Sequence, residues 1–443
     1  MTVDKNIVTN VLDITLKSGA QNARITLNKG VQNSVIVLDN KLDQLHHAAD
    51  LSLYIQLFIN ERYGAFSTNR IKYDEVKLFI KKGIEATLFL EPDPYRILPE
   101  KELYYKGGKE DLHQFDSEIE NITTEDRKKI TFECSREIFG TNNKLLTAET
   151  EFGDMMDYTY MMDSNGFEGE VLQSSYTIST NCSVKGSGNS RPESWWYESS
   201  MFLDKLKVKG CAQTALERAI KSINPKKLTS GKYTMVLENT ISSRVVAPII
   251  SALNGSSIQQ NNSFLIDKLG KKMFPENMNL CDEPHLVGYS GSRYFDGEGI
   301  ATKPIDIISN GIVNTYFLNT YFGKKLGISP TIESPSVLKF SKQEKISEKK
   351  LTLASIIKNA RKGILVTGFN GGNYNSATGD FSYGIQGFYF DGGDIIHPIN
   401  EMNVTGNFIQ LWNNLLSIGD DPRNCSNWQI PTLAFENVDF SGL

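Results

Sequence analysis

Histidine and cysteine are scarce in this sequence, with five of each among 443 residues. The histidines form no HExxH or HExxxH pair, so the helix that gives a zinc ion two imidazole ligands and a general base is absent. The cysteines lie far apart and include no CxxC spacing, which argues against a disulfide framework and against a cysteine zinc site. This cysteine usage is typical of a protein from a reducing compartment.

A long apolar run and an excess of positive charge are also missing. No stretch of about 18 apolar residues occurs, so we expect no membrane-spanning helix. The N-terminal sequence MTVDKNIVTN has an early acid and no apolar core of a secretory signal, so we expect a cytoplasmic protein. The net charge of -5 argues against a dedicated nucleic-acid-binding protein, because phosphate contacts need a basic surface.

What is present is the composition of a folded protein, 40% hydrophobic and 22% charged. In the first half, the spacing of apolar residues predicts helices over 4–18, 74–90, 123–139 and 201–223. Strand patterns occupy 23–27, 34–38, 51–59, 65–68, 144–151, 157–163 and 167–184. We therefore expect an N-terminal α+β region over 1–228, with helices on mostly antiparallel sheet and a turn-rich connection near 95–122.

The second half has a different character. A strand over 232–237 and a helix over 240–253 are followed, beyond about residue 273, by short strands and many glycines. Ten glycines lie between Gly363 and Gly406, and glycine at that density permits the bulges of a strongly curved sheet. The sequence thus predicts an overall α+β fold whose C-terminal domain, 229–443, is β-rich and glycine-bulged, as in a closed or half-closed barrel.

Three residues of the second half are weak candidates for metal ligands. His285 and His397 each stand next to a proline in an expected loop, and Cys425 could converge with them. Two surface histidines and a buried thiol explain the same pattern, and we favour that explanation.

A basic stretch runs from Lys324 to Lys362, where ten lysines and arginines stand against three glutamates. Such an excess could meet phosphate or an acidic partner. Phe340 is the only aromatic residue within the stretch, which favours a solvated surface over a nucleic-acid-binding one.

The densest set of motifs reads GFNGGN over 368–373, ATGDFS over 377–382 and VTGN over 404–407. Bulged antiparallel sheet with small polar side chains suits an extended peptide that approaches the backbone. Glycines that only bend the sheet explain the spacing equally well. The candidate peptide-binding residues are Asn370, Gly371, Gly372, Thr378, Gly379, Asp380 and Ser382.

With these motifs the chain resembles the TldD/PmbA family, and within it the TldE (PmbA) branch. Further matching motifs are GAFST over 64–68, DSNGF over 163–167, SFL over 263–265 and FDGEG over 295–299. The resemblance extends in order over nearly the whole chain. It implies an α+β N-terminal region, a β-rich C-terminal domain, and a cytosolic heterodimeric protease that acts on small unfolded peptides.

The resemblance also shows where this chain departs from the family's zinc-binding subunit. The TldD-type subunit carries an HExxxH helix and a downstream cysteine as zinc ligands, whereas the matching helix here reads RVVAPIISA over 244–252. Ala247 and Ala252 cannot bind a metal, and Pro248 cannot accept a proton. We therefore expect no catalytic residue and no cofactor in this chain, and zinc in a TldD-like partner subunit.

The leading hypothesis is a non-catalytic partner subunit of a TldD/TldE-like zinc metallopeptidase, which helps to form the chamber for small unfolded peptides. One alternative is a stand-alone or homodimeric peptidase with an unconventional site at His285, His397 and Cys425. A second alternative is a modulator of DNA gyrase that contacts DNA, since the family has carried that label and the basic stretch invites such a contact.

Overall fold

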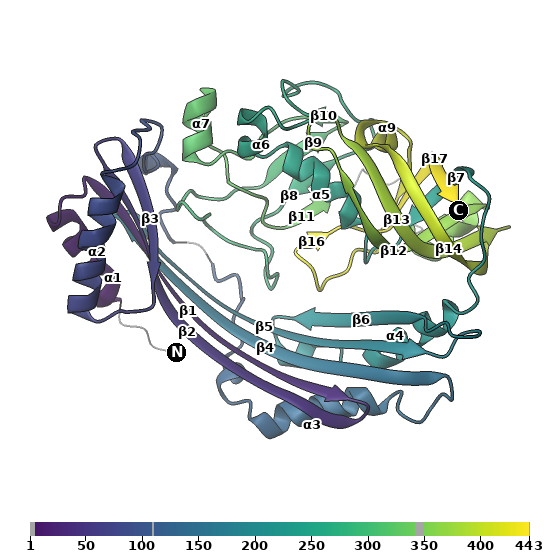
Figure 1. Ribbon diagram of the computed structural model, residues 1–443. Coiled ribbons are helices and arrows are strands. Elements are labelled where there is room, and N and C mark those ends of the chain that lie inside the picture. The colour runs from purple at the N-terminus through teal and green to yellow at the C-terminus, as the bar shows by residue number, and fades with distance from the viewer. Residues whose placement is uncertain (1–4, 109, 342–349, 443) are drawn as a thin grey trace.

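The computed structural model describes residues 5–108, 110–341 and 350–442 and arranges their strands in three sheets (Figure 1). The first sheet has six antiparallel strands in the order β3-β2-β1-β4-β5-β6. Its strands are β1 (Asn22–Leu38), β2 (Lys41–Ile59), β3 (Arg62–Thr68), β4 (Leu145–Asp163), β5 (Glu168–Val184) and β6 (Glu193–Ser200). Two-residue turns join β1 to β2 and β2 to β3, with positive φ at Asp39, Asn40, Asn60 and Glu61.

Four helices cover one face of this sheet: α1 (Asn6–Lys17), α2 (Tyr73–Thr87), α3 (Thr124–Arg136) and α4 (Cys211–Lys221). Ile25 and Ile55 form one core with α1 and α2, while Phe152 and Ile178 form a second core with α3 and α4. Because side chains alternate along a strand, the residues between them point to the other face. That face carries many polar side chains, both neutral and acidic: Thr26, Asn28, Gln32, Gln56, Glu151, Asp157, Thr159, Gln173, Ser175, Thr177 and Ser179.

The C-terminal part contains a barrel. Its strands are β7 (Gly231–Leu237), β12 (Gly363–Tyr374), β13 (Asp380–Asp391), β14 (Asp394–Asn407), β15 (Leu415–Ile418) and β17 (Leu433–Gly442). They pair in the order β14-β13-β12-β7-β17-β15, and a further pairing of β14 with β17 closes the sheet on itself. Helices α5 (Ser243–Ala252) and α9 (Phe408–Asn413) supply core residues, and Trp412 donates a hydrogen bond to the Val245 carbonyl over 3.2 Å.

Glycines allow the barrel strands to bend, as the sequence predicts. The register shifts between Val366 and Gly368 and between Ile385 and Gly387. A Cβ atom on Gly387 would lie 2.0 Å from the Leu365 carbonyl oxygen, so only glycine fits there. The expected α+β fold with a β-rich, glycine-bulged C-terminal domain is confirmed.

A smaller five-stranded sheet lies beside the barrel, in the order β10-β9-β8-β11-β16. Its strands are β8 (Leu280–Asp282), β9 (Ile305–Ser309), β10 (Ile312–Val313), β11 (Leu338–Phe340) and β16 (Trp428–Gln429). Short helices accompany it, namely α6 (Gly255–Gln259), α7 (Thr320–Leu326) and α8 (Leu353–Ala360). Within the described ranges, no helix is both long and apolar enough to cross a bilayer.

Several element boundaries differ from the sequence-based expectations. The strands expected over 23–27 and 34–38 are one strand, β1, and those over 144–151 and 157–163 are one strand, β4. Their polar middles break the local pattern, but neighbours on both sides hold the backbone extended. The helix expected over 201–223 begins only at Cys211, because Gly210 has a left-handed φ of 88°. Strand β6 was not expected at all.

In its described residues, the connection near 95–122 has two short 3-10 turns, Lys101–Leu103 and Ser117–Glu120, as its only helical elements, and it links the two halves of the molecule. Tyr105 and Ala301 form backbone hydrogen bonds with Gly299 and Leu103, respectively. Gln114 donates to the carbonyls of Tyr289 and Ser292, at 2.8 Å each. These contacts fix the C-terminal part above the first sheet.

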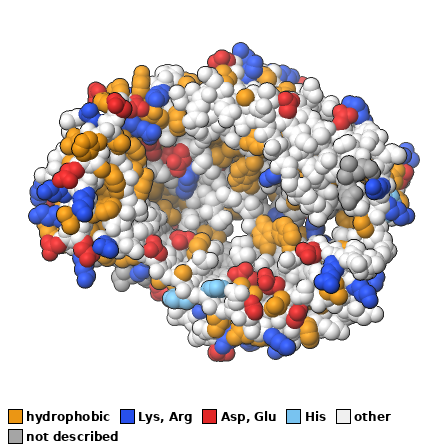
Figure 2. All heavy atoms as spheres, in the orientation of Figure 1, with side chains coloured by type: hydrophobic (Ala, Val, Ile, Leu, Met, Phe, Trp, Pro, Cys, Tyr) orange, Lys and Arg blue, Asp and Glu red, His pale blue; other side chains and the backbone are white. Residues whose placement is uncertain are grey.

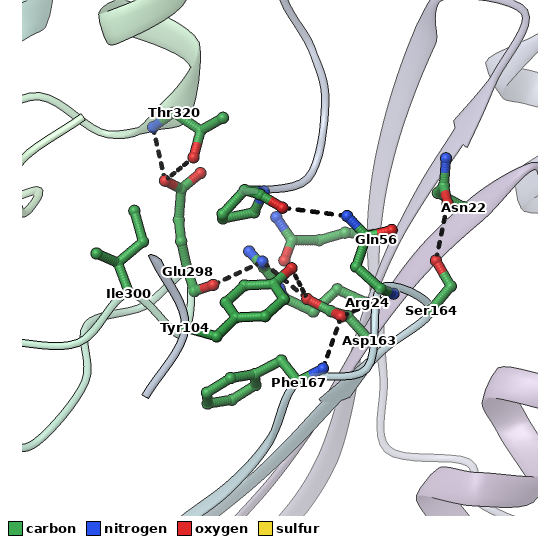
Figure 3. A network of polar contacts seen from close by, with 12 residues as sticks. Asn22, Arg24, Gln56, Tyr104, Asp163, Ser164, Phe167, Glu298, Ile300 and Thr320 are labelled. Atoms are coloured by element: carbon green, nitrogen blue, oxygen red, sulfur yellow. Dashed lines mark hydrogen bonds and ion pairs between the residues drawn. The ribbon is translucent and has the colours of Figure 1, made fainter. Parts of the chain in front are cut away.

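A buried ion pair forms the centre of this junction (Figure 3). Arg24 on β1 donates to Asp163 on β4 over 3.1 Å and to the backbone carbonyl of Glu298 over 2.7 Å. The Asp163 carboxylate also accepts from the Tyr104 hydroxyl at 2.6 Å and from the Phe167 backbone N–H at 3.1 Å. The side chains of Arg24 and Asp163 are 2% and 0% exposed, so water screens neither charge.

The turn that Arg24 contacts contains a buried carboxyl group of its own. Asp296 is 2% exposed, and its Oδ1 accepts the backbone N–H groups of Glu298 and Ile300 at 2.9 and 3.0 Å. Its Oδ2 has no hydrogen-bond partner among the described residues. Burial, followed by the nearby carboxylates of Glu333 and Glu298, raises the pKa of Asp296 to about 7.

Replacing Asp163 with alanine is expected to lower the free energy of unfolding by about 3–5 kcal/mol, because Arg24 would remain buried without a counter-charge. Urea unfolding followed by circular dichroism measures the loss. Asp439→Ala is the matched control, since Asp439 pairs with Lys232 over 3.3 Å at a site where both side chains are about 60% exposed. The control substitution should lower the free energy of unfolding by less than about 1 kcal/mol. Equal losses in the two variants would contradict the stabilising role of the junction.

Ionisation of Asp296 is expected to make the stability of the folded chain depend on pH. Its raised pKa means that the folded chain holds a proton which the unfolded chain releases near the ordinary carboxyl pKa. Stability should therefore fall as pH rises through the window from about 4 to about 7. Asp282, whose pKa burial raises to about 6, contributes with the same sign.

Asp296→Asn keeps the Oδ1 acceptor but cannot ionise, so the unfolding midpoint of this variant should vary less with pH than that of the parent chain. Urea titrations over this pH range measure the two slopes. Asp439→Asn, at an exposed position, should retain the parental slope. An unchanged slope in Asp296→Asn would refute the assignment.

Candidate functional site: a cleft between the sheet and the barrel

A cleft of about 1550 Å³ separates the end of the first sheet from the barrel. In Figure 2 the surface is hollowed between the first sheet and the C-terminal part, which lie below and above it, respectively, in Figure 1. One wall comes from residues 190–195 at the start of β6, together with the C-terminal end of α4. The opposite wall comes from strands β12, β13 and β14 and from the first half of α5.

Backbone groups are available on the wall formed by β6. This strand is the edge of the first sheet, and among the described strands it pairs only with β5. The other edge of a terminal strand presents N–H and C=O groups that no strand pairs. On β6 the Tyr197 carbonyl accepts a hydrogen bond from Arg423, whereas residues 193–195 line the cleft. An extended chain in the cleft can therefore add to β6 as a further strand.

The barrel wall is largely apolar, with Phe369, Ile385 and Met402 among its residues. Gly384 and Gly387 also line it, and a Cβ atom on Gly384 would lie 2.4 Å from the Asn370 carbonyl oxygen. Close strand contacts thus require these glycines, and the missing side chains leave the cleft wide. The wall can contact apolar side chains of an extended ligand.

The cleft also contains charged groups. Arg218 on α4 forms two hydrogen bonds with the carboxylate of Glu238, at 2.7 and 2.8 Å, and the Thr240 hydroxyl donates to the same carboxylate. This pair joins α4 to the end of β7 and neutralises both charges. Arg191, Lys221 and Arg244 line the same cleft.

Helix α5 is the segment that the resemblance matches to a metal-binding helix. Ala247 lines the cleft, while Pro248 and Ala252 are buried. None of the three has a side-chain atom that could bind zinc. Among the described residues, no three or more His, Cys, Asp or Glu side chains come together in a way that could hold a metal ion. The residues present do not fit a catalytic zinc ion.

The three weak candidates for metal ligands each contact different residues. His397 lines the cleft, and its Nδ1 lies 2.9 Å from the Pro398 carbonyl oxygen. His285 Nε2 lies 3.0 Å from the Thr302 hydroxyl, outside the cleft. Cys425 is half-buried beside Tyr197. The structure therefore does not bring these residues together.

The candidate peptide-binding residues are divided between the cleft and a turn at one end of the barrel. Asn370 alone lines the cleft, while Gly371 and Gly372 form a bulge with positive φ of 65° and 89°. Ser382 lies on β13, opposite Asn373 and Thr405. Thr378 and Gly379 belong to the turn between β12 and β13, and Asp380 is the first residue of β13.

In that turn, the Asp380 carboxylate accepts from the Thr378 hydroxyl at 2.7 Å and from the Asn407 amide at 2.9 Å. These two hydrogen bonds, that from Asn407 first, lower the pKa of Asp380. The ATGDFS and VTGN motifs thus stabilise each other in the described structure. Sequence reasoning missed β6, Arg191, Lys221 and Arg244, because each comes from a different element and no local motif marks them.

The basic stretch is partly neutralised by acidic neighbours. The Lys324 ammonium lies 3.0 Å from a carboxylate oxygen of Glu100, and the Lys325 ammonium lies 3.5 Å from a carboxylate oxygen of Asp93. Lys339 pairs with Glu283 at 3.6 Å, and Lys362 pairs with Asp391 at 3.7 Å. Residues 342–349 of the basic stretch are not among those that the structure describes. The paired lysines do not form a continuous basic surface for phosphates.

Comparisons with known proteins agree with the resemblance. Residues 115–223 match the family model described as the PmbA/TldA metallopeptidase central domain, and residues 230–442 match its C-terminal domain. A Haemophilus influenzae protein named metalloprotease PmbA homolog is 24% identical, over 99% of this chain and 96% of its own length.

Solved structures of similar proteins match the whole chain. A Bacteroides thetaiotaomicron protein that carries the label modulator of DNA gyrase is 44% identical, with a TM-score of 0.96 and 100% of both chains covered. TldE from Thermococcus kodakarensis is 16% identical and has a TM-score of 0.83, over 98% of this chain and 100% of its own, which shows the same fold. Since two family models together match more than half of the sequence, the chain belongs to the PmbA/TldD metallopeptidase family.

Proposed function

We propose that this protein is the non-catalytic subunit of a TldD/TldE-type metallopeptidase, which processes small unfolded peptides. The observation that carries the proposal is the composition of α5. This helix lines a large cleft in a member of a metallopeptidase family, yet Ala247, Pro248 and Ala252 offer no metal ligand or general base. The zinc ion and its ligands would belong to a TldD-like partner subunit.

The cleft supports a role in holding peptide. Residues 193–195 of β6 offer part of a strand edge, the barrel wall offers apolar contacts, and the open face of the first sheet offers polar side chains. Backbone pairing is independent of side-chain identity, so such a surface accepts many unfolded sequences. A folded domain has few free backbone groups of its own, so it cannot pair with the strand edge in this way and is not expected to bind in the cleft.

The first prediction of the proposal concerns metal content. The chain purified alone, without a histidine tag or chelator, should contain close to no zinc, because its cleft lacks the three protein ligands that a catalytic zinc needs. Elemental analysis by inductively coupled plasma mass spectrometry measures zinc per chain. A ratio near one would contradict the proposal and direct attention to His397, His285 and Cys425.

The second prediction concerns activity of the assembled pair. With a TldD-like subunit present, cleavage of a short unstructured peptide should need this chain, and Ala247→Phe should reduce cleavage by about tenfold or more by filling the cleft. Ala86→Phe makes the same change at an exposed position on α2 and should cleave like the parent pair. Full cleavage without this chain would refute the proposal.

A further inference from the structure

The charges that line the cleft are unbalanced. Four cations, Arg191, Arg218, Lys221 and Arg244, face two carboxylates, Glu193 and Glu238. Arg218 and Glu238 neutralise each other through their paired hydrogen bonds. The remaining lining groups leave an excess of positive charge, in a chain whose net charge is -5. A local field of this sign, opposite to that of the whole chain, favours an anionic ligand.

Arg244 is the cation best placed to bind such a ligand. Its side chain is exposed and lies over the Tyr383 ring, 5.2 Å from the centroid. Among the described residues it has no hydrogen-bond or ion-pair partner. Stacking on the ring limits the guanidinium's freedom and leaves its N–H groups available, so less entropy is lost when a planar anion binds.

The surroundings of Arg244 add to its preference for an anion. Arg244 occupies the first turn of α5, where the helix dipole is positive and where no acidic residue is present. Ile241 and Ala247 lie beside it in the cleft wall. Apolar walls reduce screening by water, so a charge-assisted hydrogen bond to Arg244 is stronger than one on an open surface.

We propose that Arg244 binds a carboxylate of the peptide held in the cleft, while Arg191 and Lys221 on the opposite wall add to the positive charge of the cleft. This inference rests on the proposed function, because it assumes that a peptide occupies the cleft. The carboxylate belongs either to the free C-terminus of the peptide or to an acidic side chain. Apolar residues beside the carboxylate contact the barrel wall at Phe369 and Ile385.

The test is fluorescence anisotropy with the full chain and short, flexible, dye-labelled peptides of one neutral sequence. Three forms are compared: a free C-terminal carboxylate, a C-terminal amide, and the amide form with one glutamate. The free-carboxylate or the glutamate form should bind about tenfold or more tightly than the neutral amide, as expected for hydrogen bonds to a charged group. Whichever form gains affinity identifies the source of the carboxylate.

Arg244→Ala should abolish this preference, and Arg244→Lys should retain part of it, since lysine keeps the charge but loses the planar pair of donors. Arg70→Ala removes an exposed arginine outside the cleft and should leave all three affinities unchanged. Far-ultraviolet circular dichroism of each variant confirms that it is folded.

Equal affinity for all three peptides, or an unchanged preference in folded Arg244→Ala, would overturn the carboxylate site and leave the peptide cleft standing. Absence of binding by every peptide would overturn both the carboxylate site and the peptide-holding role of this chain. The zinc and reconstitution measurements decide the subunit assignment independently of these outcomes.

Discussion

The buried pair of Arg24 and Asp163 determines how the two halves of the molecule meet. Arg24 extends from the first sheet and contacts the backbone of Glu298 in the C-terminal part, while Asp163 holds Tyr104 in the connection. Aromatic rings of Tyr104, Phe167 and Phe295 surround the pair, with neighbouring centroids 5.2–5.3 Å apart. Because two buried charges satisfy each other in few geometries, this junction fixes the angle between sheet and barrel.

That angle has a functional consequence. The Arg24 junction holds one end of the sheet. At the other end, Arg218 on α4 forms hydrogen bonds with Glu238 beside β7, and this pair lines the cleft. No further strand of the described chain pairs with the outer edge of β6, where residues 193–195 line the cleft and the Tyr197 carbonyl accepts a hydrogen bond from Arg423. Edge strands are ordinarily protected against pairing with foreign chains, so an open edge inside a cleft suits a protein that holds extended peptides.

The described residues that line the cleft include no group of side chains that could hold a metal ion. Helix α5 presents Ala247 to the cleft at a position matched to a zinc ligand of the TldD-type subunit, and it presents Arg244 three residues earlier. An arginine is a poor metal ligand at any ordinary pH because it stays protonated, but it is well suited to a carboxylate. Under the function proposed above, this part of α5 would position a peptide for a hydrolytic centre in another subunit.

Prediction from sequence succeeded where the signal is local. Alternation over 51–59 identified part of β2, the glycines between Gly363 and Gly406 identified a bulged sheet, and the motifs identified the family. It failed for β6, whose residues are mostly half-exposed on both faces and so have no clear alternation. It also divided β1 and β4, since their continuity depends on hydrogen bonds from neighbouring strands.

The sequence by itself determined the fold class, the family and the absence of ligands on α5, because periodicity, glycine spacing and residue chemistry are properties of the chain. Only the tertiary structure decided which residues share the cleft. Arg191, Lys221 and Arg244 come from a loop, α4 and α5, and Asp380 and Asn407 use their hydrogen bonds within a turn. Side chains distant in sequence meet only when the sheets pack, so no local pattern could have joined them.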